Sequence, residues 1–229
     1  MLFGWFVFGP SIWILLPALA LAVFAQWRVR STYRKYAGVP SQQGVTAEGA
    51  ARRLLQDEFV RDVTIEQSGG GRALSDHYDP RKKVLRLSAP DSSSISAIGV
   101  AAHEAGHAIQ DEKGFGPLAF RTSIVPIAQI GSQLAFPLLF LGLIFRYQPL
   151  ITVGIILFSA AVLFTLFTLP VEFDASRRAI GALRSSGIVT IEELGAVKEV
   201  LFAAALTYVA AAAMAALQLV LLLMAGRRR

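Results

Sequence analysis

The sequence predicts a mainly α-helical integral membrane protein with a small polar module, and two observations carry that prediction. Of its 229 residues, 54% are hydrophobic and only 17% are charged, an apolar share above that of an average soluble domain. The charges are also unevenly distributed, because Asp, Glu, Lys, Arg and His are all absent from residues 1–27, 122–145, 147–171 and 200–226. A helix needs roughly 20 apolar residues to cross a bilayer. Four transmembrane helices are therefore expected.

The first span, 1–27, sets the orientation. It is followed at once by the basic residues Arg28, Arg30, Arg34 and Lys35, and basic residues next to a span favour the cytoplasmic side. The N-terminus is therefore predicted to lie outside. The apolar run is long and no basic segment precedes it, so we expect an uncleaved anchor and not a signal peptide.

Four alternating spans place residues 28–121 and 172–199 on one side of the cell membrane. These two segments carry 18 of the 22 Lys and Arg residues, which predicts that this side is cytoplasmic. The arginines at 227–229 would then lie outside, against the same tendency. The 18 basic residues on the other side outweigh them. The basic residues are expected to contact anionic lipid headgroups, and nucleic acid is not an expected partner, because no aromatic residues are interleaved with them.

Residues 28–121 are polar enough to form a small cytoplasmic α+β module. Thr46–Phe59 has a threonine cap and helical apolar spacing, which predicts an amphipathic helix. Residues 63–65 and Val84–Leu87 alternate as strands do, and the glycines at 69–71 predict a flexible turn. The second strand is either an edge that pairs with extended substrate or an ordinary structural strand.

The rest of the chain follows from the apolar windows. After the capping cluster at 91–94, a helix is predicted over 95–111. Residues 122–171 should form a transmembrane hairpin of the second and third helices. A cytoplasmic helical segment is expected over 172–199, and 200–229 should hold the fourth span and a basic tail.

The predicted helix 95–111 contains the motif His103-Glu104-Ala105-Gly106-His107. A spacing of four places both imidazoles on one face of a helix, where they can bind one tetrahedral ion. Glu104 projects beside that ion, where it can take a proton from water. This is the HExxH arrangement typical of zinc peptidases. The alternative is that both histidines are interfacial polar residues satisfied by hydrogen bonds.

A catalytic zinc site usually has a third protein ligand and an open water position. The chain has no cysteine, so the third ligand must supply an oxygen or a nitrogen donor. Asp111 lies ~6 Å along the helix axis from His107, and Glu112 faces another direction, so both are expected to be surface carboxylates. Glu172 is the first charged residue after the third window and emerges on the same side as the histidines. It is either the third ligand or a carboxylate paired with a neighbouring arginine.

Two further residues are candidates for supporting roles. Asp174 either orients a histidine ligand or caps the helix that carries Glu172. His77 lies in a predicted polar loop between two strands. It is either a surface residue or a donor to the oxyanion that forms when water attacks a peptide carbonyl.

The sequence resembles the bacterial membrane-associated neutral zinc metallopeptidases of the YugP-like type. The resemblance rests on four blocks within residues 75–179, at 75–80, 84–88, 100–110 and 169–179. More distantly, the plan is similar to that of heat-shock membrane proteases and CAAX-prenyl endopeptidases. This resemblance implies a zincin-like module, one zinc ion per chain and Glu172 as the third ligand. Those relatives place an aspartate four residues after the ligand glutamate, where this chain has Ser176.

The resulting hypothesis is a membrane-embedded zinc endopeptidase with a cytoplasmic active site, acting on protein or peptide substrates. An intramembrane zinc protease is one alternative. It is disfavoured because only 12 uncharged residues separate Asp91 from Glu104, too few to carry the motif to the middle of a bilayer. A non-catalytic zinc-binding membrane scaffold is the other, and its metal would have four protein ligands.

Overall fold

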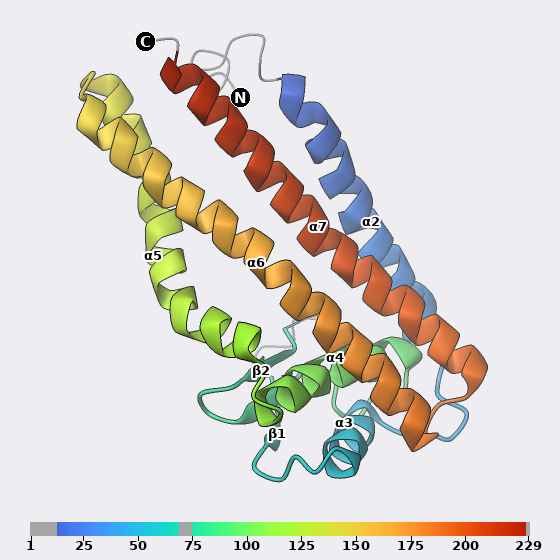
Figure 1. Cartoon of the computed structure of the whole chain (residues 1–229). Coiled ribbons are helices and arrows are strands. Elements are labelled where there is room, and N and C mark those ends of the chain that lie inside the picture. Colours follow the sequence, from blue (N-terminus) through green and yellow to red (C-terminus); the bar gives the residue numbers. More distant parts are fainter. Residues whose placement is uncertain (1–12, 69–74, 228–229) are drawn as a thin grey trace. The chain divides into compact units, whose positions relative to one another are not determined.

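The computed structural model (Figure 1) describes residues 13–68 and 75–227, which form a mostly helical chain with one small sheet. Four of these helices are long and apolar enough to cross a membrane, as predicted: α2 (Leu16–Ala37), α5 (Gly116–Ile144), α6 (Gln148–Ser186) and α7 (Ile191–Arg227). The first part of the predicted N-terminal span, the predicted glycine turn at 69–71 and the last two arginines lie outside the described residues.

Helices α6 and α7 contain most of residues 172–199, for which a helical segment was expected. Each continues without a break beyond its apolar window, so residues 172–186 are the end of α6 and residues 191–199 are the beginning of α7. A short turn joins them, in which Gly187 has a φ of 66° that suits glycine. The charged segment is therefore mostly helical and consists of extensions of two candidate spans.

The chain divides into two compact units, and the first contains most of the apolar windows. It takes in α2 up to Ala25, residues 120–169 of α5 and α6, and α7 from Thr207 onward. Its helices approach closely at glycine, because a Cβ atom added to Gly154 would lie 3.0 Å from the carbonyl oxygen of Ala135. Many of its large apolar side chains are exposed, among them Ile127, Ile156 and Leu163, as expected for a surface that contacts lipid.

The second unit comprises residues 26–119 and 170–206 and contains every residue predicted to act at the site. Its core lies where α3 (Ala47–Asp57) packs on α4 (Ile95–Glu112) beside the sheet (Figure 1). Apolar side chains of α6 and α7 complete this core. Its fully buried members include Leu54, Ile98, Leu183 and Val197.

Local sequence signals set the limits of α3 and α4. The Thr46 side chain accepts a hydrogen bond from the N–H of Gly49, and that of Ser94 accepts one from Ala97, as N-cap residues do. Helix α4 ends at Glu112. Shortly after it, Gly114 has a φ of 61°, which lets the N–H of Phe115 bond back to the carbonyl of Gln110 at 2.9 Å.

The sheet has three strands, β1 (Thr64–Gln67), β2 (His77–Asp79) and β3 (Val84–Leu87), in the order β1-β3-β2. β3 pairs with β1 in parallel and with β2 antiparallel. It is therefore the central strand, and the idea that β3 offers an edge to substrate is wrong. His77 lies in strand β2 and not in a loop, because its segment pairs with β3.

Candidate metal centre

Helix α4 positions the two histidines of the motif. His103 and His107 lie one turn apart, with ring centroids 4.9 Å from each other and ring planes at 78°. The His107 side chain is 8% exposed and that of His103 14%. The spacing of four thus produces the shared helix face that the sequence predicted.

Glu172 of α6 meets these rings, although it is far away in sequence. Its Oε2 atom lies 3.2 Å from Nε2 of His103 and 3.6 Å from Nε2 of His107. Ligand atoms of the three side chains lie within 4.8 Å of one another, and the Glu172 side chain is only 3% exposed. The structure therefore brings together the three residues that were candidates for metal ligation.

The Nδ1 atom of each histidine faces a polar side chain. Nδ1 of His103 lies 3.1 Å from Oγ of Ser176, and Nδ1 of His107 lies 2.9 Å from Oε1 of Gln110. Metal-binding histidines almost always use their second ring nitrogen in this way, which fixes the ring and its tautomer. The two Nε2 atoms consequently both face the Glu172 carboxylate.

This donor set fits zinc. Two imidazole nitrogens and one carboxylate oxygen are a common ligand set for a catalytic zinc ion. Ligand distances of ~2.0–2.1 Å in a tetrahedral site place neighbouring ligand atoms ~3.3 Å apart. The measured separations of 3.2 and 3.6 Å between Oε2 of Glu172 and the two Nε2 atoms lie on either side of that value.

Gly106 explains how α4 and α6 approach closely enough for this arrangement. A Cβ atom added to Gly106 would lie 2.3 Å from the carbonyl oxygen of Ala175, a separation that no side chain tolerates. Gly106 lies between the histidines in sequence, and Ala175 lies three residues after Glu172. The glycine therefore permits the contact that puts ligands from two helices in one place.

Glu104 is held from the sheet side. Its Oε2 atom accepts a hydrogen bond of 2.9 Å from the backbone N–H of Tyr78 in β2. The Tyr78 hydroxyl donates to Asp111, further along α4, at 2.7 Å. Burial, and then this hydrogen bond, raise the pKa of the Tyr78 phenol well above its ordinary value. Strand β2 is thus attached to α4 at two points, one of which orients Glu104.

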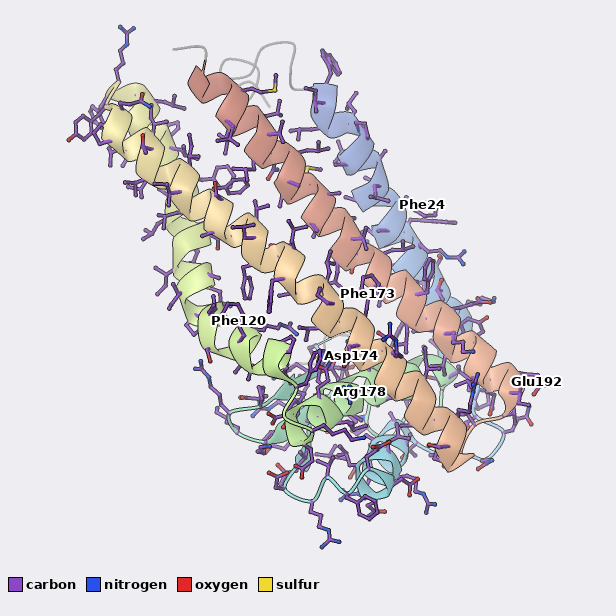
Figure 2. The ribbon with its side chains drawn as sticks, viewed as in Figure 1. Phe24, Phe120, Phe173, Asp174, Arg178 and Glu192 are labelled. Atoms are coloured by element: carbon purple, nitrogen blue, oxygen red, sulfur yellow. The ribbon has the colours of Figure 1, made fainter. Side chains whose placement is uncertain are left out.

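Asp174 does not contact a histidine directly. Its Oδ2 atom accepts hydrogen bonds from the side chains of Gln110 at 2.8 Å and Arg178 at 2.6 Å. Asp174 and Arg178 project from neighbouring turns of α6 (Figure 2). Asp174 is thus connected to His107 through Gln110.

Comparison with known proteins identifies the family of the chain. Residues 11–227 match a protein family described as "Putative neutral zinc metallopeptidase". The chain belongs to this family. It is also 48% identical over 204 residues to the "Putative membrane protease YugP" of Bacillus subtilis (strain 168), a match that covers 88% of this chain and 89% of the relative. No solved structure matches the chain significantly.

His77 lies outside the group of three candidate ligands, His103, His107 and Glu172. It is exposed, its Nδ1 lies 3.1 Å from the carbonyl oxygen of Ser75, and its Nε2 lies 3.2 Å from Arg86 on β3. Its neighbour Tyr78 is the residue whose side chain contacts α4, and successive side chains of a strand point to opposite faces. The structure thus does not bring His77 to the three candidate ligands.

Three residues near the site were missed by the sequence reasoning: Ser176, Gln110 and Tyr78. Ser176 occupies the position four after Glu172, where distant relatives have aspartate, so a signal for it existed. Gln110 lies one turn beyond His107, and its contacts with α6 depend on tertiary packing. Tyr78 acts on Glu104 through its backbone N–H, which no side-chain pattern reveals.

Proposed function

We propose that the protein is a membrane-anchored zinc endopeptidase that holds one zinc ion through His103, His107 and Glu172. The observation that carries this proposal is the convergence of both Nε2 atoms on one buried carboxylate, with both Nδ1 atoms held by polar side chains. The family and the membrane protease relative support the same reaction class.

The residues of the chain then have distinct roles in peptide hydrolysis. A bound zinc ion supplies Lewis-acid activation of water and of the scissile carbonyl. Glu104 accepts the proton of the attacking water and later delivers it to the leaving amine, acting as general base and then as general acid. The Tyr78 N–H holds one oxygen of the Glu104 carboxylate, which limits the directions in which the other oxygen can point. His77 has no part in this scheme, and its oxyanion role stays a prediction.

The two alternatives find less support. A structural zinc site needs four protein ligands, whereas the metal-ligating group found in residues 13–68 and 75–227 has three members. An intramembrane protease would carry its motif on a spanning helix. Helix α4 is not among the candidate spans of the described residues, and it packs on α3 and the sheet.

We further propose that the module of residues 28–121 and the charged segment 172–199 face the cytoplasm. The support is the distribution of Lys and Arg along the sequence. The substrates would then be proteins or peptides that reach the cytoplasmic side of the cell membrane.

Zinc analysis of the full chain in detergent tests the proposal. We expect about one zinc ion per chain for the wild type, and loss of both zinc and peptide cleavage after treatment with a chelator. The His103→Ala variant should contain only background zinc, because two ligands are too few to retain the ion. His77→Ala is the matched control, since it removes the remaining histidine and should keep its zinc. Full zinc occupancy in His103→Ala would contradict the ligand assignment.

The orientation has its own test, which the absence of cysteine makes simple. In intact cells, an impermeant maleimide should label the Gln148→Cys variant, whose residue lies in the predicted external connection. It should label Lys82→Cys only after the membrane has been made permeable. Both positions are exposed in the structure. The reverse labelling pattern would place the module outside.

A further inference from the structure

Gln110 is a fully buried polar residue next to the candidate ligands, and every polar group of its side chain is engaged. Its exposed fraction is 0%. Its Oε1 atom lies 2.9 Å from Nδ1 of His107, and its Nε2 atom donates to the carbonyl of Val171 at 3.0 Å and to Asp174 at 2.8 Å. These contacts join α4 to the segment of α6 that carries Glu172.

The partners of Gln110 fix which way its amide points. A backbone carbonyl accepts hydrogen bonds and cannot donate them, and the same is true of an ionised carboxylate. The amide nitrogen must therefore face Val171 and Asp174. The Val171 carbonyl alone decides this orientation, because the same amide nitrogen makes both contacts. This leaves the amide oxygen, which is only an acceptor, facing His107.

We propose that Gln110 is a positioning residue that holds His107 in the tautomer protonated at Nδ1. The amide oxygen can bond to Nδ1 only if that nitrogen carries the proton. Nε2 of the neutral ring then presents its lone pair toward Glu172, ready to bind a metal. The significance of this arrangement for zinc rests on the proposed function, whereas the tautomer itself does not.

The same amide also couples the two helices that supply ligands. Val171 directly precedes Glu172, so the hydrogen bond from Gln110 to the Val171 carbonyl restrains the backbone next to the third ligand. One side chain thus sets the direction of His107 and the position of α6 relative to α4. Ser176 has a single such contact with His103.

Two variants separate these functions. Gln110→Met has a similar length but neither donor nor acceptor, and we expect its zinc affinity to fall about 10–100-fold, as for other residues that support metal ligands. Gln110→Glu also loses the donor to Val171 but keeps an oxygen for Nδ1 of His107. It should bind zinc about tenfold more tightly than Gln110→Met, or more tightly still, because contacts that support a metal ligand change metal affinity by about 10–100-fold. Competition with a chelator measures both affinities.

The tautomer is measured directly on metal-free protein labelled with ¹⁵N-histidine, well above the ordinary histidine pKa of ~6.5. The chain has only three histidines, so their resonances can be assigned with single-histidine variants. We expect His107 to be protonated at Nδ1 in the wild type and to shift toward the other tautomer in Gln110→Met.

The possible outcomes are distinct. A wild-type His107 protonated mainly at Nε2 would overturn the proposal, and so would equal zinc affinities for the wild type and Gln110→Met. Equal affinities for the two Gln110 variants would assign the effect to the helix contact and would also overturn it. If the wild type binds no zinc, the proposed function fails, and the spectrum of the metal-free protein still decides the role of Gln110. If Gln110→Met does not fold, the spectrum of the metal-free wild type still tests the role of Gln110.

Discussion

Replacement of Glu104 by glutamine is expected to leave zinc bound and to reduce peptide cleavage on the order of 10³-fold, within the range of general acid–base catalysis. The amide has almost the same shape and can still accept the hydrogen bond from Tyr78 that Glu104 accepts at 2.9 Å. It cannot take a proton from water at neutral pH. Zinc content and the cleavage rate of a peptide substrate, measured on the same preparation, check this expectation.

A matched control lies on the same helix. Glu112, the last residue of α4, is exposed, and Glu112→Gln makes the same chemical change outside the site. We expect its cleavage rate to equal that of the wild type. If Glu104→Gln with bound zinc cleaved as fast as Glu112→Gln, the assignment of Glu104 as general base would be wrong.

The parts of the fold that could be predicted are those that local sequence controls. Windows without charge gave the four candidate spans, because a helix that faces lipid must be apolar along its length. Strand β3 has the predicted bounds, Val84–Leu87, and α4 begins at the predicted residue and ends one residue later than expected. Ser94 belongs to the capping cluster that predicted this start, and its side chain accepts a hydrogen bond from the N–H of Ala97.

The parts that could not be predicted depend on contacts between distant segments. Strand β2 has only three residues and exists because it pairs with β3, so its own pattern looked like a loop. The central position of β3 is likewise a property of the whole sheet. The approach of Glu172 to the histidines is also a contact between distant segments. Its place at the end of an apolar window made this contact possible but left a pairing with a neighbouring arginine as the alternative. The residues that face each Nδ1 atom could not be predicted, because their positions depend on how α4 packs on α6.

Gly106→Ala is expected to damage the site without touching any ligand. The new methyl group would lie 2.3 Å from the carbonyl oxygen of Ala175, so α4 and α6 must move apart. Overpacking of this kind costs about 1–3 kcal/mol of unfolding free energy. Because a displacement of about 1 Å can reduce catalysis about 10²-fold, we expect weaker zinc binding and a cleavage rate lowered by about that factor. Thermal unfolding, zinc affinity and cleavage measure the three effects.

Gly99→Ala is the control for this change, because it introduces the same methyl group into the same helix. There a Cβ atom would lie 3.4 Å from Cγ1 of Val197, an ordinary contact distance, and alanine favours a helix over glycine by about 1 kcal/mol. Gly99→Ala should therefore be at least as stable as the wild type and fully active. If the two variants behaved alike, the close contact between Gly106 and Ala175 would not be what brings His103 and His107 to Glu172.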